Sequence, residues 1–199
     1  MSPADAFDRR NLVTYASLLC GVGALEAAWS GHARTALGLV ALAVVADTLD
    51  GRFARLFGDD PRRKALGVQL DSLADAIAFG IAPVVAAGSA FDAAHAGHGV
   101  LWILAAFGYA ACAITRLGFY NVSPDAERGS GFVGVPVPLA ALVLCSVSAA
   151  RPSFPAFVLV ATACAAAMVL PLRIPRPRRA GLLVFLLWPL AVAAMMLWR

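Results

Sequence analysis

The feature that most constrains this chain is a series of apolar runs, each near the length of a membrane span, that fill most of its 199 residues. A transmembrane helix needs about 20 consecutive, mostly apolar residues. Seven runs qualify, at residues 12–29, 34–57, 66–90, 99–120, 133–149, 154–170 and 180–198. We therefore expect an all-α, polytopic transmembrane helix bundle of six to eight spans, in a single domain covering residues 1–199.

The composition favours a membrane domain over a soluble one. Hydrophobic residues make up 61% of the chain and charged residues 14%, with a mean hydropathy of +0.79, whereas charged residues are roughly 25% of a soluble domain. A chain this short has too little interior to bury the excess, so lipid must cover it. The net charge of +4 does not indicate a nucleic-acid partner, because most basic residues lie in short segments beside apolar runs, as in proteins that contact anionic lipid.

The distribution of basic residues predicts the orientation. They are concentrated before the first run, between the second and third, and after the fourth and sixth, whereas the opposite side receives only Arg34, Arg151 and Arg199. By the positive-inside rule, the N-terminus and the connection between the second and third runs lie in the cytoplasm. We expect a multi-pass protein of the cell (inner) membrane with its functional site at the cytoplasmic end.

Four aspartates lie inside apolar runs, Asp47 and Asp50 in the second and Asp71 and Asp75 in the third. A carboxylate at mid-helix costs about 2.5–3.5 kcal/mol on insertion scales, so four of them require a reason. On a helix, the two acids of each run share one face, and Asp47 and Asp75 would lie roughly 13–15 Å from the connecting turn. Two antiparallel neighbouring helices would bring all four carboxylates together.

A cluster of four carboxylates requires cations. Carboxylate ligands select hard ions over zinc, and we expect Mg²⁺ or Mn²⁺, with two ions bound. The histidines are not expected ligands, because His32, His95 and His98 fall in loops on the opposite side. Paired ions beside a glycine and an arginine suit a pyrophosphate. The alternative is a set of structural ion pairs, for instance between Asp50 and Arg55.

The residues around the acids form a longer motif. Asp47-x-x-Asp50-Gly51-x-x-Ala54-Arg55, followed by Gly67-x-x-x-Asp71-x-x-x-Asp75, resembles the signature of the CDP-alcohol phosphatidyltransferase family. The run QLDSLADAIAFGIAP at 69–83 is very similar to the third helix of members that use serine. The blocks RLGFYN at 116–121 and GFVGVP at 131–136 resemble the next blocks of those members, although Phe119 replaces a second arginine and Tyr120 a phenylalanine.

This resemblance implies transfer of the phosphatidyl group from CDP-diacylglycerol to the hydroxyl of L-serine, with release of CMP, in a protein that forms a homodimer. Four residues would hold the divalent ions: Asp47, Asp50, Asp71 and Asp75. Four would contact the cytidine diphosphate: Gly51, Ala54, Arg55 and Gly67. Asp75 is also the candidate general base. Arg116 and Asn121 are candidates for the acceptor site. The structural alternatives are that Arg116 anchors the end of a helix and that Asn121 forms a turn.

Two alternative functions fit parts of the pattern. The first is the same transfer to another alcohol, such as inositol phosphate, glycerol phosphate or choline. The second, from another class, is a cation- or proton-coupled secondary transporter, because acids inside a membrane also relay ions. Transporters tend to place their sites at the midplane between internal repeats, whereas the aspartate motif occurs once and toward one end.

Overall fold

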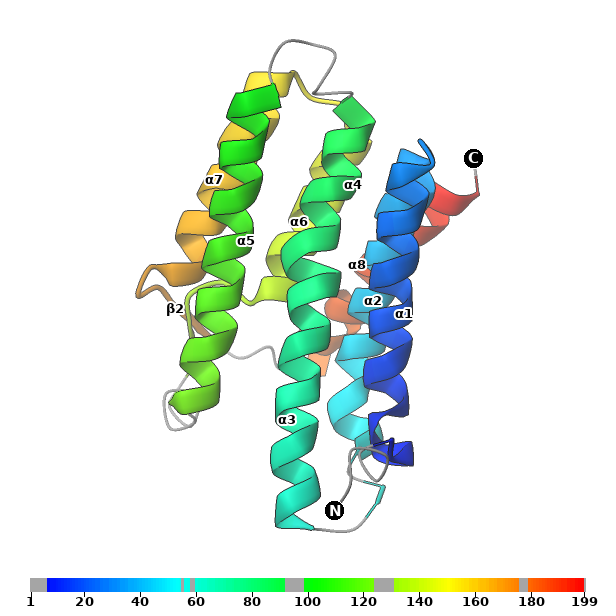
Figure 1. The fold of residues 1–199 in the computed structure, drawn as a ribbon, viewed down its shortest axis with the longest axis vertical. Helices are drawn as coiled ribbons and strands as arrows, with labels where there is room; N and C mark the ends of the chain where they lie inside the picture. The colour runs from blue at the N-terminus through cyan, green and yellow to red at the C-terminus, as the bar shows by residue number, and fades with distance from the viewer. Residues whose placement is uncertain are drawn as a thin grey trace.

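The computed structural model describes residues 7–54, 56–57, 60–91, 99–123, 131–175 and 179–198 as a helix bundle (Figure 1). The 3₁₀ turn η2 (Arg9–Asn11) leads into α1 (Leu12–Trp29). The other elements are α2 (Ala33–Ala54), α3 (Pro61–Asp75), η3 (Ala76–Ile81), α4 (Ala82–Phe91), α5 (Gly99–Val122), β1 (Gly131–Val133), α6 (Val137–Ala149), α7 (Phe154–Val169), β2 (Arg173–Pro175) and α8 (Arg179–Leu197). Because α3, η3 and α4 are continuous, all seven predicted runs are helical, and the all-α fold class is confirmed.

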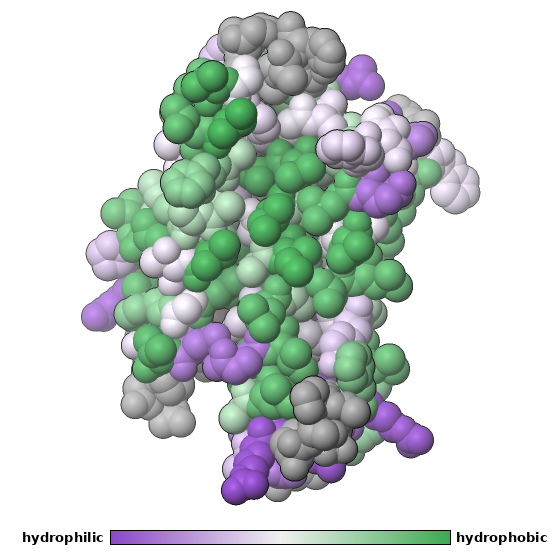
Figure 2. Space-filling model, viewed as in Figure 1, coloured by the Kyte–Doolittle hydropathy of each residue, from purple (hydrophilic) through white to green (hydrophobic). Residues whose placement is uncertain are grey.

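The helices present an apolar surface that requires lipid. Three described segments are long and apolar enough to cross a membrane by length and composition: Arg9–Trp29, Pro61–Phe91 and Gly99–Val122. Shorter apolar helices cover Val137–Ala149, Phe154–Val169 and Leu183–Leu197. Figure 2 shows green, hydrophobic side chains across the middle of one face, with purple side chains mostly toward the two ends. Exposed apolar surface on this scale marks contact with a membrane, and the chain is a membrane protein.

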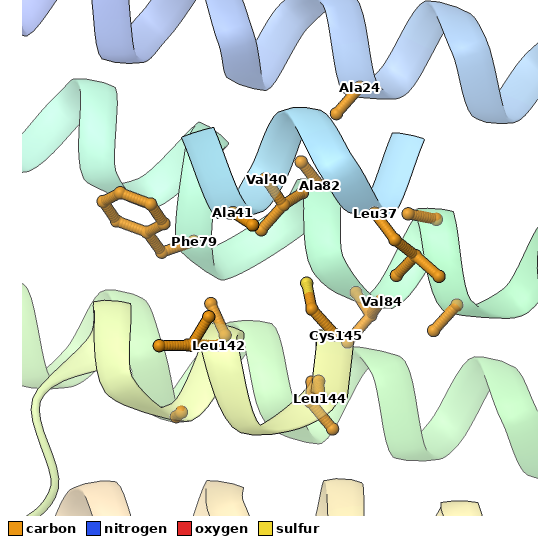
Figure 3. Packing of buried hydrophobic residues seen from close by; sticks show 14 of the residues in the cluster. Ala24, Leu37, Val40, Ala41, Phe79, Ala82, Val84, Leu142, Leu144 and Cys145 are labelled. Atoms are coloured by element: carbon orange, nitrogen blue, oxygen red, sulfur yellow. The ribbon is translucent and has the colours of Figure 1, made fainter. Parts of the chain in front are cut away.

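Helix α2 lies inside the bundle and contacts α1, α4, α6 and α8. Figure 3 shows Val40 and Ala41 of α2 among side chains of neighbouring helices, all deeply buried. Small residues permit close approach at other contacts too. A Cβ on Gly21 of α1 would lie 2.8 Å from the Cα of Ala78, closer than real Cβ atoms come. Packing through small residues is the usual way that membrane helices associate, and it holds α1, α2 and η3 together.

A π-helical segment, η3, joins α3 to α4 just before Pro83. A proline has no N–H, so the carbonyl of Phe79, four residues earlier, loses its normal helical donor. The buried hydroxyl of Tyr109 on α5 donates to this carbonyl at 3.2 Å. Pro83 is thus accommodated by a π segment, and the hydroxyl of Tyr109 on a neighbouring helix binds the carbonyl that the proline cannot serve.

Helix α3 begins earlier than the sequence predicts, at Pro61 rather than at residue 66. The side chain of Asp60 accepts from the backbone N–H of Arg62 at 3.0 Å, and Pro61 occupies the first helical turn, where no intrahelical N–H is needed. Arg63 also pairs with Asp8 at 2.7 Å, which ties the start of α3 to the segment before α1. The boundary at residue 66 was wrong because hydropathy does not detect a polar first turn.

A two-stranded antiparallel ribbon was not predicted. It pairs Gly131 with Pro175 and Val133 with Arg173. Consequently α6 begins at Val137, after Pro136, and not at residue 133 as the apolar run suggests. The error arises because Val133 to Val135 are apolar but extended, and a proline disfavours helical backbone in the residue before it.

Candidate metal centre

Three of the four predicted metal ligands converge at one place in the bundle. Asp47 lies near the end of α2, and Asp71 and Asp75 lie near the end of α3, on helices that run in opposite directions (Figure 1). One carboxylate oxygen from each lies within 4.8 Å of one from each of the others. Asp47 and Asp71 are half-buried, and Asp75 is buried. Three acids at this spacing present oxygen ligands to a single region.

Asp50 adjoins the same cluster. One of its carboxylate oxygens, Oδ2, accepts a hydrogen bond from the hydroxyl of Thr14 on α1 at 3.0 Å. The other, Oδ1, is buried and has no hydrogen-bond partner among the described residues. The carboxyl groups of Asp50 and Asp75 are close enough for their charges to interact. A buried acceptor without a donor is costly, and an ion or a water is the usual explanation.

The donor set fits a divalent cation. The ion pairs formed by the described residues involve Asp8 and Asp60, and none of them reaches the four clustered acids. Carboxylates packed this closely repel one another unless their charge is neutralised. All-oxygen ligation is typical of Mg²⁺, Mn²⁺ or Ca²⁺ sites. The cluster of Asp47, Asp71 and Asp75, with Asp50 beside it, could hold such ions.

The residues expected at the cytidine diphosphate are only partly described. Gly51 and Ala54 lie in the last turn of α2, next to the acids, whereas Arg55 and the Ala54 side chain lie outside the described residues. Gly67 faces α1, where a Cβ added to it would lie 3.4 Å from Oδ1 of Asn11. The absence of a side chain at Gly67 therefore leaves room between α3 and the start of α1, beside Asn11.

Arg116 on α5 is buried and bound to the backbone of two other segments. Its Nη1 donates to the carbonyl of Val133 in β1 and to that of Met168 in α7, the latter at 3.3 Å. Its guanidinium lies over the ring of Tyr120, 4.6 Å from the centroid. Gly134, with φ of 72°, gives the arginine space, because a Cβ there would lie 2.9 Å from Nη1 of Arg116. Arg116 thus holds the β1 segment against α5.

Tyr120, the departure from the expected phenylalanine, contributes to the same arrangement. Its hydroxyl donates to the carbonyl of Val133 at 2.7 Å and accepts from the N–H of Val133 at 2.8 Å. A phenylalanine could make neither bond. The substitution therefore adds a second attachment between α5 and β1.

Asn121 lies one helix away from the acids, at the end of α5. Its side-chain N–H donates to Oε1 of Gln69 at 3.3 Å, and its oxygen accepts from the hydroxyl of Ser72 at 3.0 Å. Both partners are on α3, and Ser72 is the neighbour of Asp71. Asn121 therefore joins α5 to the part of α3 that carries the carboxylates.

Two polar residues near the site were missed by sequence reasoning. Asn11 is buried beside Gly67, and Thr14 is bonded to Asp50, 36 residues further along the chain. Their spacing of three residues at the polar end of the first apolar run places both on one helix face. This spacing was the sequence signal that could have identified the two residues. The sequence does not say which helix the face meets.

The comparisons with known proteins identify the class. The model of the family described as CDP-alcohol phosphatidyltransferase matches residues 10–197. This match covers nearly all of the chain, including the two aspartate-bearing helices. The chain belongs to the CDP-alcohol phosphatidyltransferase family.

Curated relatives give more particular names. A CDP-diacylglycerol–serine O-phosphatidyltransferase of Mycobacterium tuberculosis (strain CDC 1551 / Oshkosh) is 31% identical over 147 residues, which are 71% of this chain and 49% of the relative. A protein of the same name from Helicobacter pylori (strain ATCC 700392 / 26695) is 34% identical over 139 residues, 68% of this chain and 55% of the relative. An archaetidylserine synthase of Methanothermobacter thermautotrophicus is 36% identical over 119 residues, 58% of this chain and 47% of the relative. The chain thus spans about half the length of these relatives.

Proposed function

We propose that this protein transfers the phosphatidyl group of CDP-diacylglycerol to the hydroxyl of L-serine, releasing CMP and forming phosphatidylserine. The observation that carries the proposal is the convergence of Asp47, Asp71 and Asp75, with Asp50 beside them, from two antiparallel helices in a chain of this family. Structural ion pairing does not account for these acids, because no ion pair of the described residues reaches them.

The four aspartates would hold two divalent ions, Mg²⁺ or Mn²⁺. When bound, such ions neutralise the charge of a pyrophosphate and of the CMP that leaves it. The chain's own contribution is to fix the carboxylates on rigid helices. Gly51, Ala54, Arg55 and Gly67 would accommodate the cytidine diphosphate beside them, with Arg55 supplying a forked donor to phosphate.

Asp75 would accept the proton of the acceptor hydroxyl. The serine oxygen forms a bond to the phosphorus that carries the diacylglycerol, and the bond from that phosphorus to the oxygen of CMP breaks. The hydroxyl proton passes to the carboxylate, and the electron pair of the broken bond leaves with CMP. Asp75 suits this role because it is buried, 8% exposed, at the deep end of the cluster, where water competes least with the acceptor.

Serine is favoured over the other acceptors by the names of the relatives and by the similarity of residues 69–83 to members that use serine. Asn121 would contact the acceptor, since it is bonded to Ser72 beside Asp71. Arg116 remains the candidate for the serine carboxylate. The two backbone carbonyls that it binds through Nη1 fix the position of its guanidinium.

The acids would face the cytoplasm, in a homodimer of the inner membrane. The basic residues around α3 support this orientation by the positive-inside rule. A cysteine at the exposed Lys64 tests it. An impermeant thiol reagent should label Lys64→Cys only after the cells are broken, with wild-type protein as the control for its native cysteines. Labelling in intact cells would place the acids on the outside.

An acceptor panel tests the reaction itself. Purified full chain is supplied with labelled CDP-diacylglycerol, Mg²⁺ and, in separate reactions, serine, inositol phosphate, glycerol phosphate or choline. We expect a labelled lipid and stoichiometric CMP with serine. A product with another alcohol alone would contradict the serine assignment and leave the transfer reaction standing. Absence of CMP release with every acceptor would contradict an enzymatic function and favour a transporter.

A further inference from the structure

The end of the bundle opposite to the aspartates contains a cavity of about 750 Å³. It lies where the ends of α2, α4, α6 and α8 meet, on the side where Figure 1 shows the connection between α6 and α7 and the C-terminus. Two arginines line it, Arg34 from α2 and Arg151 from the turn after α6, which are far apart in the sequence. These are the only basic residues, other than Arg199, that the positive-inside pattern leaves on this side.

The guanidinium of Arg34 has one buried N–H group without a hydrogen-bond acceptor among the described residues. Its Nη2 donates to the carbonyl of Met195 in α8 at 2.9 Å. Its Nε is buried and has no hydrogen-bond partner among the described residues. A guanidinium N–H that is buried without an acceptor is costly, and a bound ligand is one way to satisfy it.

Arg151 adopts a backbone conformation that an arginine does not favour. Its φ is 49°, in the left-handed region, where a helix end usually carries glycine. Its backbone N–H donates to the carbonyl of Ser148, a residue that also lines the cavity. The strained position costs of order 1 kcal/mol, so a glycine would serve the turn better. Arg151 is exposed and is one of the residues that line the cavity.

Apart from Ser148, the rest of the lining is apolar, and part of it is exposed. Leu37 and Met196 are buried in it, whereas Met195 is 47% exposed. Trp29 at the end of α1 and Trp198 after α8 are 93% and 91% exposed at the same end of the bundle. Exposed tryptophans mark the level of the lipid head groups. The cavity is thus at the depth where a phosphate and the first part of an acyl chain meet.

We infer that this cavity binds an anionic phospholipid of the leaflet opposite to the aspartates, with its phosphate between Arg34 and Arg151 and its acyl chains against Leu37, Met195 and Met196. Two arginines give the phosphate a charge-assisted, forked set of donors. No described acidic residue lines the cavity, so a head group without a compensating positive charge is preferred over a choline head group. The inference stands independently of the transfer reaction.

The test measures lipid binding by the purified full chain in detergent, using native mass spectrometry and thermal stability. The probes are phosphatidylglycerol, phosphatidylcholine and inorganic phosphate. We expect phosphatidylglycerol to bind and stabilise the wild type, phosphatidylcholine to bind several-fold less tightly, and inorganic phosphate at the same concentration to have no effect. Equal stabilisation by inorganic phosphate would mean a free-anion site and would overturn the lipid assignment.

Variants separate binding from folding. Arg151→Gly removes the guanidinium and relieves the left-handed φ, so the lipid-free protein should be at least as stable as wild type while its affinity for phosphatidylglycerol falls about tenfold or more. Arg34→Lys keeps the charge but loses the Nε donor and should bind less tightly by a smaller factor. The matched control is Arg62→Ala, which removes one exposed arginine at the other end. Unchanged affinity in Arg151→Gly, or an equal loss in Arg62→Ala, would overturn the inference.

Discussion

The two ends of this bundle differ in the sign of the charge that they bring together. At one end Asp47, Asp71 and Asp75 lie within 4.8 Å of one another, with Asp50 beside them. At the other end Arg34 and Arg151 line a cavity. The acids come from two consecutive helices, whereas the arginines come from elements far apart in the sequence. The ligands that we propose carry the opposite charge in each case, a divalent cation for the acids and a lipid phosphate for the arginines.

Removal of divalent metal should have the largest effect, and only on the aspartate end. Exhaustive chelation should reduce CMP release to background, because the clustered carboxylates would repel an added pyrophosphate. Added Mg²⁺ or Mn²⁺ should restore it. Binding of phosphatidylglycerol at the arginine end should not change. Undiminished turnover after chelation would remove the metal role of the acids.

Asp75→Asn should have the next largest effect. It keeps the shape of the side chain but removes the proton acceptor, so turnover should fall by about 10²–10⁴ while CDP-diacylglycerol still binds. Single-turnover rates and nucleotide binding measure the two parts separately. Asp47→Asn should instead weaken metal binding together with turnover. The control is Asp8→Asn, the same change outside the cluster, and a rate within a few-fold of wild type in Asp75→Asn would exclude it as the base.

Arg116→Ala should raise the KM for serine about tenfold or more, and the KM for CDP-diacylglycerol far less, if its guanidinium binds the acceptor carboxylate. Because Arg116 also binds the carbonyls of Val133 and Met168, some loss of stability is expected as well. The control is Thr115→Ala, its exposed neighbour. Equal increases in both KM values, in step with the lost stability, would reduce Arg116 to a residue that holds β1.

Tyr109→Phe tests the middle of the bundle, between the two ends. It removes the hydroxyl that donates to the buried carbonyl of Phe79, which should lower the free energy of unfolding by about 1–3 kcal/mol. Thermal unfolding in detergent measures the change. Metal binding and phosphatidylglycerol binding should both be retained below the melting temperature. A selective loss at either end would show that this bond supports one site in particular.

The smallest effect concerns the ion pair between Asp8 and Arg63. The hydrogen bond from Arg63 lowers the pKa of Asp8 in the folded protein. A lowered folded pKa contributes stability above the unfolded value of about 3.9, and this contribution is lost as the pH falls through the folded value. The melting temperatures of wild type and Asp8→Asn should therefore differ at pH 6 and converge toward pH 3. A constant difference would mean that the pair does not act through ionisation.

The helical architecture was predictable because hydropathy over about 20 residues determines whether a segment spans a membrane. The aspartate cluster was predictable for a similar local reason. Asp47, Asp50, Asp71 and Asp75 lie on two consecutive helices joined by a short connection, so helical periodicity and depth suffice to bring them together. Helix ends were less predictable, since the polar start at Asp60 and the extended Val133 depend on capping and on a strand partner.

The sequence by itself determined which segments are helical, which acids meet and which side carries most of the basic residues. Only the tertiary structure decided that Thr14 binds Asp50, that Tyr109 satisfies the carbonyl left by Pro83, and that Arg34 and Arg151 line one cavity. The physical reason is the separation along the chain over which each kind of sequence signal acts. Periodicity and hydropathy act within one helix or between neighbours in the chain, whereas the packing of distant helices depends on the shapes of all their faces at once.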